Sequence, residues 1–218
     1  MNTVTSTEQA LATSKVLLAK GLVELDFRLN AEQQGLLLQY LVLLEKWNQV
    51  YNLTSIRELA KMVVAHLLDS ISVVPLISGE NVLDVGSGAG LPGIPIAVAK
   101  PDCKVTLLDS NHKKAAFLRQ AVADLALKNA DVICDRVESW AAATEFDVII
   151  SRAFSDLGEF VSLASRLLAP GGVLAAMKGL YPFEELDNLP SGFQVKEVRA
   201  LQVPGLEAER HLVLIERT

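Results

Sequence analysis

Cysteine, long apolar runs and a targeting segment are scarce or missing in this sequence. Its two cysteines, Cys103 and Cys134, are too few for the disulfide framework of a small secreted protein. No Cys or His pair has the spacing of zinc ligands. Charged residues interrupt each apolar run before about 18 residues, so we predict no membrane span. The first ten residues carry Glu8 and lack a basic segment followed by an apolar core, which predicts no secretory signal. These absences favour a cytoplasmic protein with reduced thiols.

Positive charge is also in deficit. The chain has 20 Lys and Arg against 26 Asp and Glu, a formal net charge of −6. Nonspecific nucleic-acid binding depends on phosphate neutralisation, so this charge argues against a protein that coats nucleic acid. It is compatible with a local basic site.

The chain has 218 residues, 50% of them hydrophobic. Folding at this length buries roughly 70% of the unfolded surface, so one domain with a short extension needs no disulfide or structural metal.

The first part of the chain has helical character. It contains two glycines before Gly79 and repeats apolar residues every three or four positions. We therefore predict an N-terminal helical extension over residues 1–78, packed on a core domain over residues 79–218. We expect a first helix at residues 8–20. A second helix should begin at a capping box formed by Asn30 and Gln33 and continue to Tyr51. A third should begin at a capping box formed by Ser55 and Glu58 and continue towards Leu76.

From residue 81, short β-branched runs alternate with helical stretches, which predicts a mostly parallel sheet with helical crossovers. The last two strands are separated by a loop with Pro204 and Gly205 rather than by a long helix, so we expect an antiparallel pair at the sheet edge. The fold class is thus α/β, Rossmann-like, with seven strands. Strands are expected at 81–85, 104–109, 130–134, 146–151, 172–177, 193–199 and 210–216. Helices are expected at 92–100, 112–128, 156–169 and 182–188.

A glycine-rich loop follows the first of these strands. Asp84-Val85 runs into Gly86-Ser87-Gly88-Ala89-Gly90-Leu91-Pro92-Gly93. Glycine lets a ligand approach the main chain, and open α/β sheets bind ligands at the carboxyl ends of their strands. Leu91 stands where a dinucleotide fingerprint needs Gly or Ala, and no Lys followed by Ser or Thr makes a P-loop. Asp84 would place a carboxylate beside the ligand, which suits the cationic S-adenosylmethionine better than a pyrophosphate.

Two further positions support that ligand. Asp109 ends the second strand, where a carboxylate can accept both ribose hydroxyl protons. Val137, through its backbone, and Glu138 follow the third strand and could read an adenine edge. Each feature alone is compatible with a tight turn, a helix cap or a surface charge. Taken in this order, they favour S-adenosylmethionine, with no metal.

At this point the sequence resembles the class I S-adenosylmethionine-dependent methyltransferases. More narrowly, it resembles the bacterial small-subunit ribosomal RNA guanine-N7 methyltransferase family once called glucose-inhibited division protein B, from about residue 25 onward. The resemblance implies methylation of N7 of a guanine in 16S ribosomal RNA, with S-adenosylhomocysteine as product. The segments that carry it are 47–54 (WNQVYNLT), 66–70 (HLLDS), 84–95 (DVGSGAGLPGIP), 146–153 (FDVIISRA) and 210–212 (RHL).

The resemblance also implies roles for particular residues. Cofactor contacts fall on Gly86, Leu91, Val137, Glu138 and Arg152, to which the residues themselves add Asp84, Gly88 and Asp109. Basic residues for RNA and catalysis fall on Lys113, Arg136, Arg152, Lys178 and Arg210.

Any one of these cations, taken alone, is more often a solvated surface charge. His66 and Asp69 are three residues apart on a helix, which predicts a structural hydrogen bond between them. Trp47 and Tyr51 are expected as core anchors.

The residues after the fourth strand bear on the chemistry. Guanine N7 has a free lone pair and no proton to lose, so methyl transfer needs positioning rather than a general base. Ser151-Arg152-Ala153-Phe154 is not the Asn/Asp-Pro-Pro-aromatic tetrapeptide of amine methylation. Neither cysteine follows a proline at a strand end, as carbon-5 pyrimidine chemistry requires.

Alternative functions remain at this point. One is a methyltransferase acting on a small molecule or another RNA site, which the acidic net charge favours slightly. Another is a cofactor-binding interaction protein without turnover. If the protein is instead a guanine-N7 methyltransferase of ribosomal RNA, we expect its partner to be 16S ribosomal RNA or the small ribosomal subunit. We then expect a monomer with no membrane association and no obligate protein partner.

Overall fold

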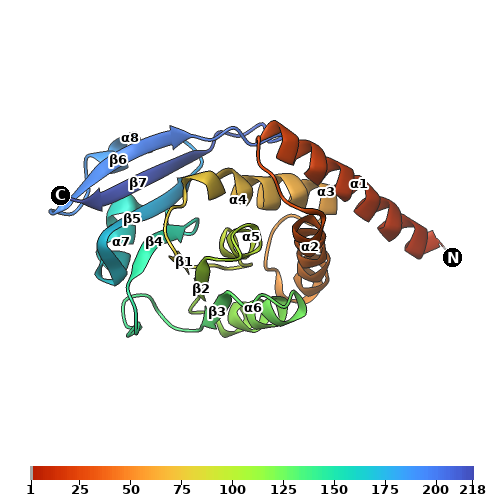
Figure 1. The fold of residues 1–218 in the computed structure, drawn as a ribbon, viewed down its shortest axis with the longest axis horizontal. Helices are drawn as coiled ribbons and strands as arrows, with labels where there is room; N and C mark the ends of the chain where they lie inside the picture. Colours follow the sequence, from red (N-terminus) through yellow and green to blue (C-terminus); the bar gives the residue numbers. More distant parts are fainter. Residues whose placement is uncertain (1) are drawn as a thin grey trace.

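The N-terminal third of the chain is helical in the computed structural model, which describes the backbone of residues 2–218 and the side chains of residues 8–218. Helix α1 projects from the body of the molecule, whereas α2 and α4 lie against it (Figure 1). These elements are α1 (Asn2–Glu24), α2 (Ala31–Tyr51), α3 (Leu59–Met62), the π-helical η1 (Val63–Leu68), α4 (Asp69–Ser72) and the 3₁₀ turn η2 (Val74–Leu76).

The two predicted capping boxes differ in outcome. The Asn30 and Gln33 box is present, with both reciprocal hydrogen bonds. The Ser55 and Glu58 box is wrong, because the helix begins at Leu59 and Glu58 makes no side-chain cap. Hydrogen bonds of Thr54 hold the segment before this helix as a loop. The Thr54 backbone N–H donates to Asn48 Oδ1, and the Thr54 hydroxyl oxygen accepts from the Ile56 N–H. Glu58 instead pairs with Lys61.

A seven-stranded sheet forms the centre of the molecule, in the order β3-β2-β1-β4-β5-β7-β6. The first five strands run parallel, and β7 is antiparallel to both β5 and β6, which confirms the predicted fold class. The strands are β1 (Asn81–Val85), β2 (Lys104–Leu108), β3 (Ala130–Ile133), β4 (Phe146–Ser151), β5 (Leu168–Lys178), β6 (Phe193–Ala200) and β7 (His211–Arg217). Strand β5 begins earlier than expected because Leu168 pairs with Phe146 ahead of a register shift.

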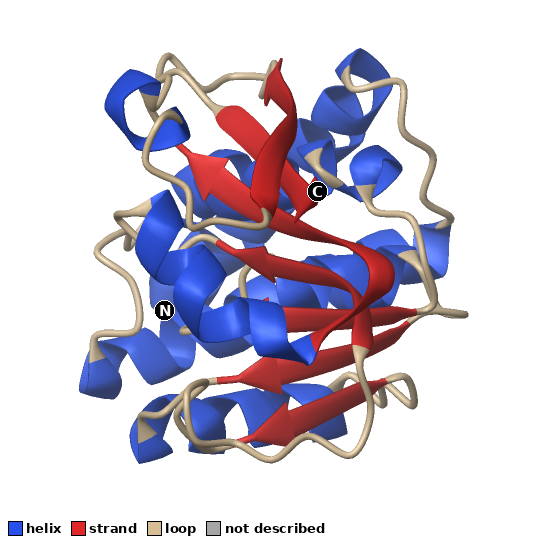
Figure 2. Cartoon of the chain, turned by 90° about the vertical axis from the view of Figure 1, so that its left-hand side faces the viewer, coloured by secondary structure: helices blue, strands red, loops and turns tan. Residues whose placement is uncertain are grey.

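Helices cover both faces of this sheet (Figure 2). Alternate strand residues enter two hydrophobic clusters: Leu107 packs with the N-terminal helices, α5 and α6, and Leu108 packs with α7. The first cluster extends from Leu18 of α1 to Leu212 of β7, so the N-terminal helices share a core with the sheet. The remaining helices are α5 (Gly93–Ala99), α6 (His112–Asp124), α7 (Leu157–Ala164), η3 (Ser165–Leu167) and α8 (Phe183–Leu186).

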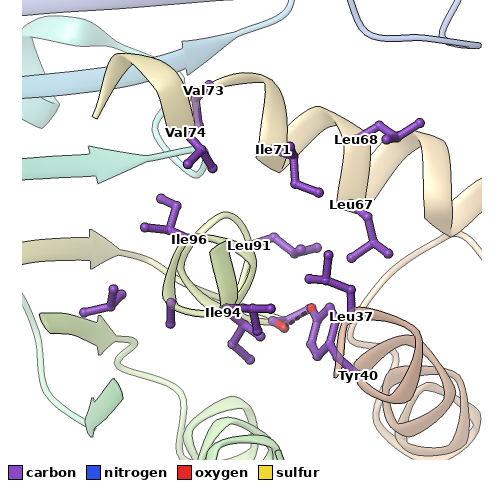
Figure 3. Close-up of a cluster of buried hydrophobic side chains, with 14 of the residues drawn as sticks. Leu37, Tyr40, Leu67, Leu68, Ile71, Val73, Val74, Leu91, Ile94 and Ile96 are labelled. Atoms are coloured by element: carbon purple, nitrogen blue, oxygen red, sulfur yellow. Dashed lines mark hydrogen bonds between the residues drawn. The ribbon is translucent and has the colours of Figure 1, made fainter. Parts of the chain in front are cut away.

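One described helical segment, Leu59–Leu76, is long and apolar enough to cross a membrane. It contains Lys61 and Asp69, and 61% of it is buried inside the protein. Its Leu67 and Ile71 side chains point into the cluster around α5 (Figure 3). The segment therefore has the character of a core helix.

Helix α2 packs against the glycine loop and is hydrogen-bonded to it through Tyr40. The Tyr40 side chain is fully buried, and its hydroxyl donates a hydrogen bond of 2.6 Å to the carbonyl oxygen of Ala89. Figure 3 shows Tyr40 reaching from α2 towards the turn before α5, beside Leu37 and Ile94. Gln33 adds a hydrogen bond of 2.9 Å from its Nε2 to the carbonyl oxygen of Val98. The N-terminal helices thus fix the position of the loop.

Candidate active site

The glycine loop leaves β1 and folds over the end of β2. The N–H groups of Gly86 and Ser87 both donate to the carbonyl oxygen of Leu108, at 2.8 and 3.1 Å. Gly86 and Gly88 have φ values of +70° and +59°, in the left-handed region. A Cβ on Gly88 would meet nothing nearer than a carbonyl oxygen at 3.8 Å, so this part of the loop borders open space. A ligand can approach the main chain there.

A cavity of about 290 Å³ lies beside this loop at the carboxyl ends of β1 to β4. We call it the Asp109 pocket; its lining includes Gly86, Asp109, Arg136, Val137, Glu138 and Ala153. Four of the predicted cofactor residues are thereby brought together. The Asp109 carboxylate accepts N–H groups from Gly88 and from Asn111, each at 2.8 Å. Each of its oxygens keeps a further lone pair for a ribose hydroxyl.

Two predicted cofactor residues lie beneath the loop rather than on the pocket. Leu91 is buried among the side chains shown in Figure 3. Asp84 is fully buried, and its Oδ2 accepts the Gly93 N–H at 3.0 Å. Its Oδ1 has no hydrogen-bond partner among the described residues. Burial raises the pKa of the Asp84 carboxyl to about 7, and the hydrogen bond from Gly93 offsets part of that effect.

A second cavity, of about 500 Å³, lies next to the first. We call it the arginine pocket; its lining includes Thr54, His66, Asp69, Arg152, Lys178 and Arg210. Asp69 Oδ1 accepts from Arg210 Nε at 2.9 Å, and Asp69 Oδ2 accepts from Arg152 Nη1 at 3.2 Å. Arg210 directly precedes β7 and still reaches this edge, because antiparallel pairing puts His211 opposite Lys178 at the end of β5.

His66 and Asp69 do not bond to each other as predicted, because both have other partners. His66 Nε2 lies 2.9 Å from Thr54 Oγ1, and its Nδ1 lies 3.0 Å from the carbonyl oxygen of Ala65. A carbonyl can only accept, so Nδ1 carries the proton and Nε2 accepts from the Thr54 hydroxyl. Burial lowers the pKa of His66 below its ordinary value, and the nearby Arg152 guanidinium lowers it further.

The other predicted cations have different surroundings. Lys178 has a buried side chain, and its Nζ pairs with Glu185 at 2.6 Å and donates to the carbonyl oxygen of Ser155. Its charge is thus neutralised within the protein. Arg136 is exposed and lines the Asp109 pocket, and its Nη1 lies 3.5 Å from Glu138 Oε1. Lys113 is exposed on α6 and lines neither of these two pockets.

Sequence reasoning missed Tyr40, which holds the glycine loop, and Lys114, which lines the Asp109 pocket with its Nζ 3.9 Å from Asp109. A tyrosine inside an amphipathic helix gives no signal of its distant partner. Trp47 packs edge-on against Phe117 of α6, as a core anchor should. Tyr51 is wrong as a core anchor, because it is exposed and stacks on Trp47.

Two consecutive residues after β4 line the two pockets. Arg152 lines the arginine pocket, and its neighbour Ala153 lines the Asp109 pocket together with Gly86. A Cβ on Gly86 would come within 2.8 Å of the Ala153 Cβ, so the loop and this segment are in close contact. A molecule bound against the loop would therefore lie beside a pocket with two arginines.

Known proteins resemble this chain over nearly its whole length. The sequence profile of the family described as rRNA small subunit methyltransferase G matches residues 33–213. The ribosomal RNA small subunit methyltransferase G of Laribacter hongkongensis is 56% identical over 90% of this chain and 95% of its own. The protein of the same name from Nitrosospira multiformis is 51% identical over 92% and 96%.

Solved structures show the same fold at low identity. The glycopeptide N-methyltransferase MtfA, complexed with S-adenosyl-L-homocysteine, has a TM-score of 0.61 and 13% identity over 70% of this chain and 87% of its own. Precorrin-6y C5,15-methyltransferase from Geobacter metallireducens has a TM-score of 0.51 and 14% identity over 78% and 93%.

Proposed function

Because the chain belongs to the rRNA small subunit methyltransferase G family, we propose that it methylates N7 of a guanine in 16S ribosomal RNA, with S-adenosylmethionine as methyl donor. The observation that carries this proposal is the junction of the two pockets at Arg152 and Ala153. It would put a methyl donor in one pocket next to an acceptor base in the other.

The Asp109 pocket fits S-adenosylmethionine by its chemistry. Asp109 has lone pairs to accept ribose hydroxyls, and the open face of Gly88 leaves room against the main chain. Val137 lines this pocket, so its backbone can contact the adenine base there, as the resemblance implies. Asp84 and Leu91 would act indirectly, by shaping the loop from below.

The chemistry asks the protein for placement and charge. S-adenosylmethionine, when bound, supplies an electrophilic methyl group. Guanidinium N–H groups of Arg152 and Arg210 can donate to guanine O6 and to RNA phosphates, which leaves the N7 lone pair free to attack. The Nε2 of His66 lies 2.9 Å from the Thr54 hydroxyl and burial lowers the pKa of the ring, so this scheme gives His66 no role as a base. Lys113 and Lys178 remain predictions, and the paired charge of Lys178 favours a role in shaping the pocket.

The net charge of −6 bears on the form of the RNA. An acidic protein gains little from nonspecific phosphate contacts, so we expect it to need a preassembled RNA shape, as in the small ribosomal subunit. We further propose that it works in the cytoplasm as a monomer without an obligate protein partner.

The proposal is tested by mass spectrometry of ribosomal RNA from cells with and without the gene. The strain without it should lack one N7-methylguanosine in 16S RNA, and the wild-type gene should restore the mark. A Gly88→Val gene, which places a branched side chain in the open space beside the glycine loop, should not restore it. An unchanged set of 16S modifications would contradict the proposal and favour a small-molecule acceptor or another RNA.

A further inference from the structure

Asp69 joins two arginines from distant parts of the chain. Arg152 lies 83 positions after it and Arg210 lies 141 positions after it, yet each contacts one of its carboxylate oxygens. Asp69 is the first residue of α4, Arg152 follows β4, and Arg210 precedes β7. The carboxylate therefore ties the N-terminal helices to both sides of the arginine pocket.

The burial of these groups shows which member fixes the others. The Asp69 side chain is 1% exposed, whereas Arg152 and Arg210 are 31% and 25% exposed. A buried carboxylate needs compensating donors, and two guanidinium groups at one pocket repel each other without a carboxylate between them. Asp69 is thus the buried member of this cluster, and the two arginines are its partly exposed members.

The backbone before Asp69 contributes to the same contact. The π-helical segment η1 covers Val63–Leu68, and the Ala65 carbonyl oxygen accepts from Arg152 Nη1 at 3.3 Å. The same guanidinium nitrogen thus has a backbone partner and the Asp69 carboxylate. π-Helical turns inside α-helices are frequent at functional sites. Here the turn presents the Ala65 carbonyl and Asp69 to a single arginine.

From this geometry we infer that Asp69 is a positioning residue for methyl transfer, which sets the orientation of Arg152 and Arg210 towards the substrate RNA. The inference rests on the proposed function. Asp69 lines the arginine pocket and is absent from the lining of the Asp109 pocket. Its loss should therefore slow transfer and leave cofactor binding unchanged, since a displacement of about 1 Å can cost about 10²-fold in rate.

The test compares Asp69→Asn with the matched control Asp147→Asn. Asp147 also accepts two hydrogen bonds, from the N–H groups of Glu80 and Asn81 at 2.8 and 2.9 Å, but it lies near the start of β4, away from both pockets. With small ribosomal subunits as substrate, Asp69→Asn should lower kcat about 10²-fold with the KM for S-adenosylmethionine within about twofold of wild type. Asp147→Asn should keep kcat, even if it unfolds at a lower temperature.

A double variant separates positioning from a general structural role. If Asp69 acts through the two arginines, Asp69→Asn should lower kcat by clearly less in an Arg210→Ala protein than in the wild type, because only Arg152 is then left to misplace. Fully additive losses, or a wild-type kcat in Asp69→Asn, would overturn the inference. If the wild-type protein itself transferred no methyl group to small subunits, the proposed function would fail instead.

Two measurements keep the inference testable if Asp69→Asn does not fold. Asp69→Glu retains the charge but moves it, so it should lower kcat with little change in the unfolding temperature. In the wild-type protein, the Arg210 Nε proton should exchange slowly in nuclear magnetic resonance spectra, because it donates to a buried carboxylate. Rapid exchange of this proton would contradict the geometry on which the inference depends.

Discussion

The Asp109 pocket and the arginine pocket are lined by consecutive residues after β4, but they are formed by different parts of the chain. The Asp109 pocket is formed where successive strands end, with main-chain groups of the glycine loop and side chains close to those strand ends. The arginine pocket is assembled from side chains of the N-terminal helices, the end of β4 and the start of β7, held by one carboxylate. The difference fits the proposed division of labour, in which the Asp109 pocket would bind the cofactor and the arginine pocket would bind the RNA.

Arg210→Ala should separate the two pockets most strongly. The variant loses a guanidinium that would stabilise bound RNA, and removal of such a donor typically costs about 10² to 10³ in rate. Single-turnover kinetics should show that loss, while calorimetry shows unchanged affinity for S-adenosylmethionine. Arg199→Ala is the matched control, because Arg199 is exposed on β6 and pairs with Glu197. Equal loss of binding and transfer in Arg210→Ala would place Arg210 in the cofactor site or the fold.

Gly88→Val should act on the opposite pocket. Gly88 has a φ of +59°, and a branched side chain there would occupy the open space beside the glycine loop. Gly171→Val is the control, since Gly171 has a φ of +76° and open space around it at the far end of β5. Both variants carry the backbone strain, about 1–2 kcal/mol. Gly88→Val alone should weaken S-adenosylmethionine binding, by about tenfold or more in calorimetry. Unchanged affinity in a folded Gly88→Val protein would show that the pocket is wrongly assigned.

Tyr40→Phe tests whether the helical extension supports the cofactor side. The change removes the hydroxyl that donates to Ala89 and leaves a buried carbonyl without this donor. We expect a loss of about 1–3 kcal/mol in the free energy of unfolding and a smaller loss of cofactor affinity. Tyr51→Phe, at an exposed tyrosine of the same helix, should change neither. Denaturant titration and calorimetry check both values, and equal effects of the two changes would contradict the supporting role.

The pH dependence of transfer should be the smallest effect. No deprotonation precedes attack by N7, and burial keeps the pKa of His66 below its ordinary value. Asp84, whose pKa burial raises to about 7, lies beneath the loop and lines neither of the two pockets. With RNA and cofactor saturating and salt fixed, the single-turnover rate should therefore vary less than about twofold between pH 6 and 8.5. A rise with a midpoint near 6.5 that His112→Gln or His211→Gln abolishes would reinstate a base.

The lowered pKa of His66 also makes the free energy of unfolding depend on pH. As the pH falls below about 6.5, the unfolded chain takes up a proton at residue 66 before the folded protein does, so the free energy of unfolding falls. This contribution is fully present above that pH and is lost on acidification towards the lowered pKa of the folded state. A His66→Gln variant should lack that part of the acid dependence in denaturant titrations.

The contrast between the pockets also explains what the sequence could reveal. The strands and the Asp109 pocket follow from local signals, because Gly86, Asp109 and Glu138 each lie at or just after a strand end. The capping box at Asn30 is local too, and it was predicted correctly. The box at Ser55 was wrong because Asn48, seven residues earlier, holds the loop through Thr54.

The arginine pocket could be predicted only in part. The sequence indicates Arg152 and Arg210 as candidates, but helical spacing predicts His66 as the partner of Asp69, which in the structure binds both arginines. A contact across 141 positions leaves no trace in periodicity. Lys178 shows the same limit, because its neutralisation depends on how the segment after β5 folds back to bring Glu185 against it.

A crystal structure of the complex with S-adenosylhomocysteine tests the division between the pockets most directly. The account predicts that the ribose lies against Asp109, the adenine near Val137 and Glu138, and the amino-acid portion along Gly86, with Arg152 and Arg210 still joined to Asp69. A nucleoside bound between Arg152 and Arg210, with the Asp109 pocket empty, would contradict it.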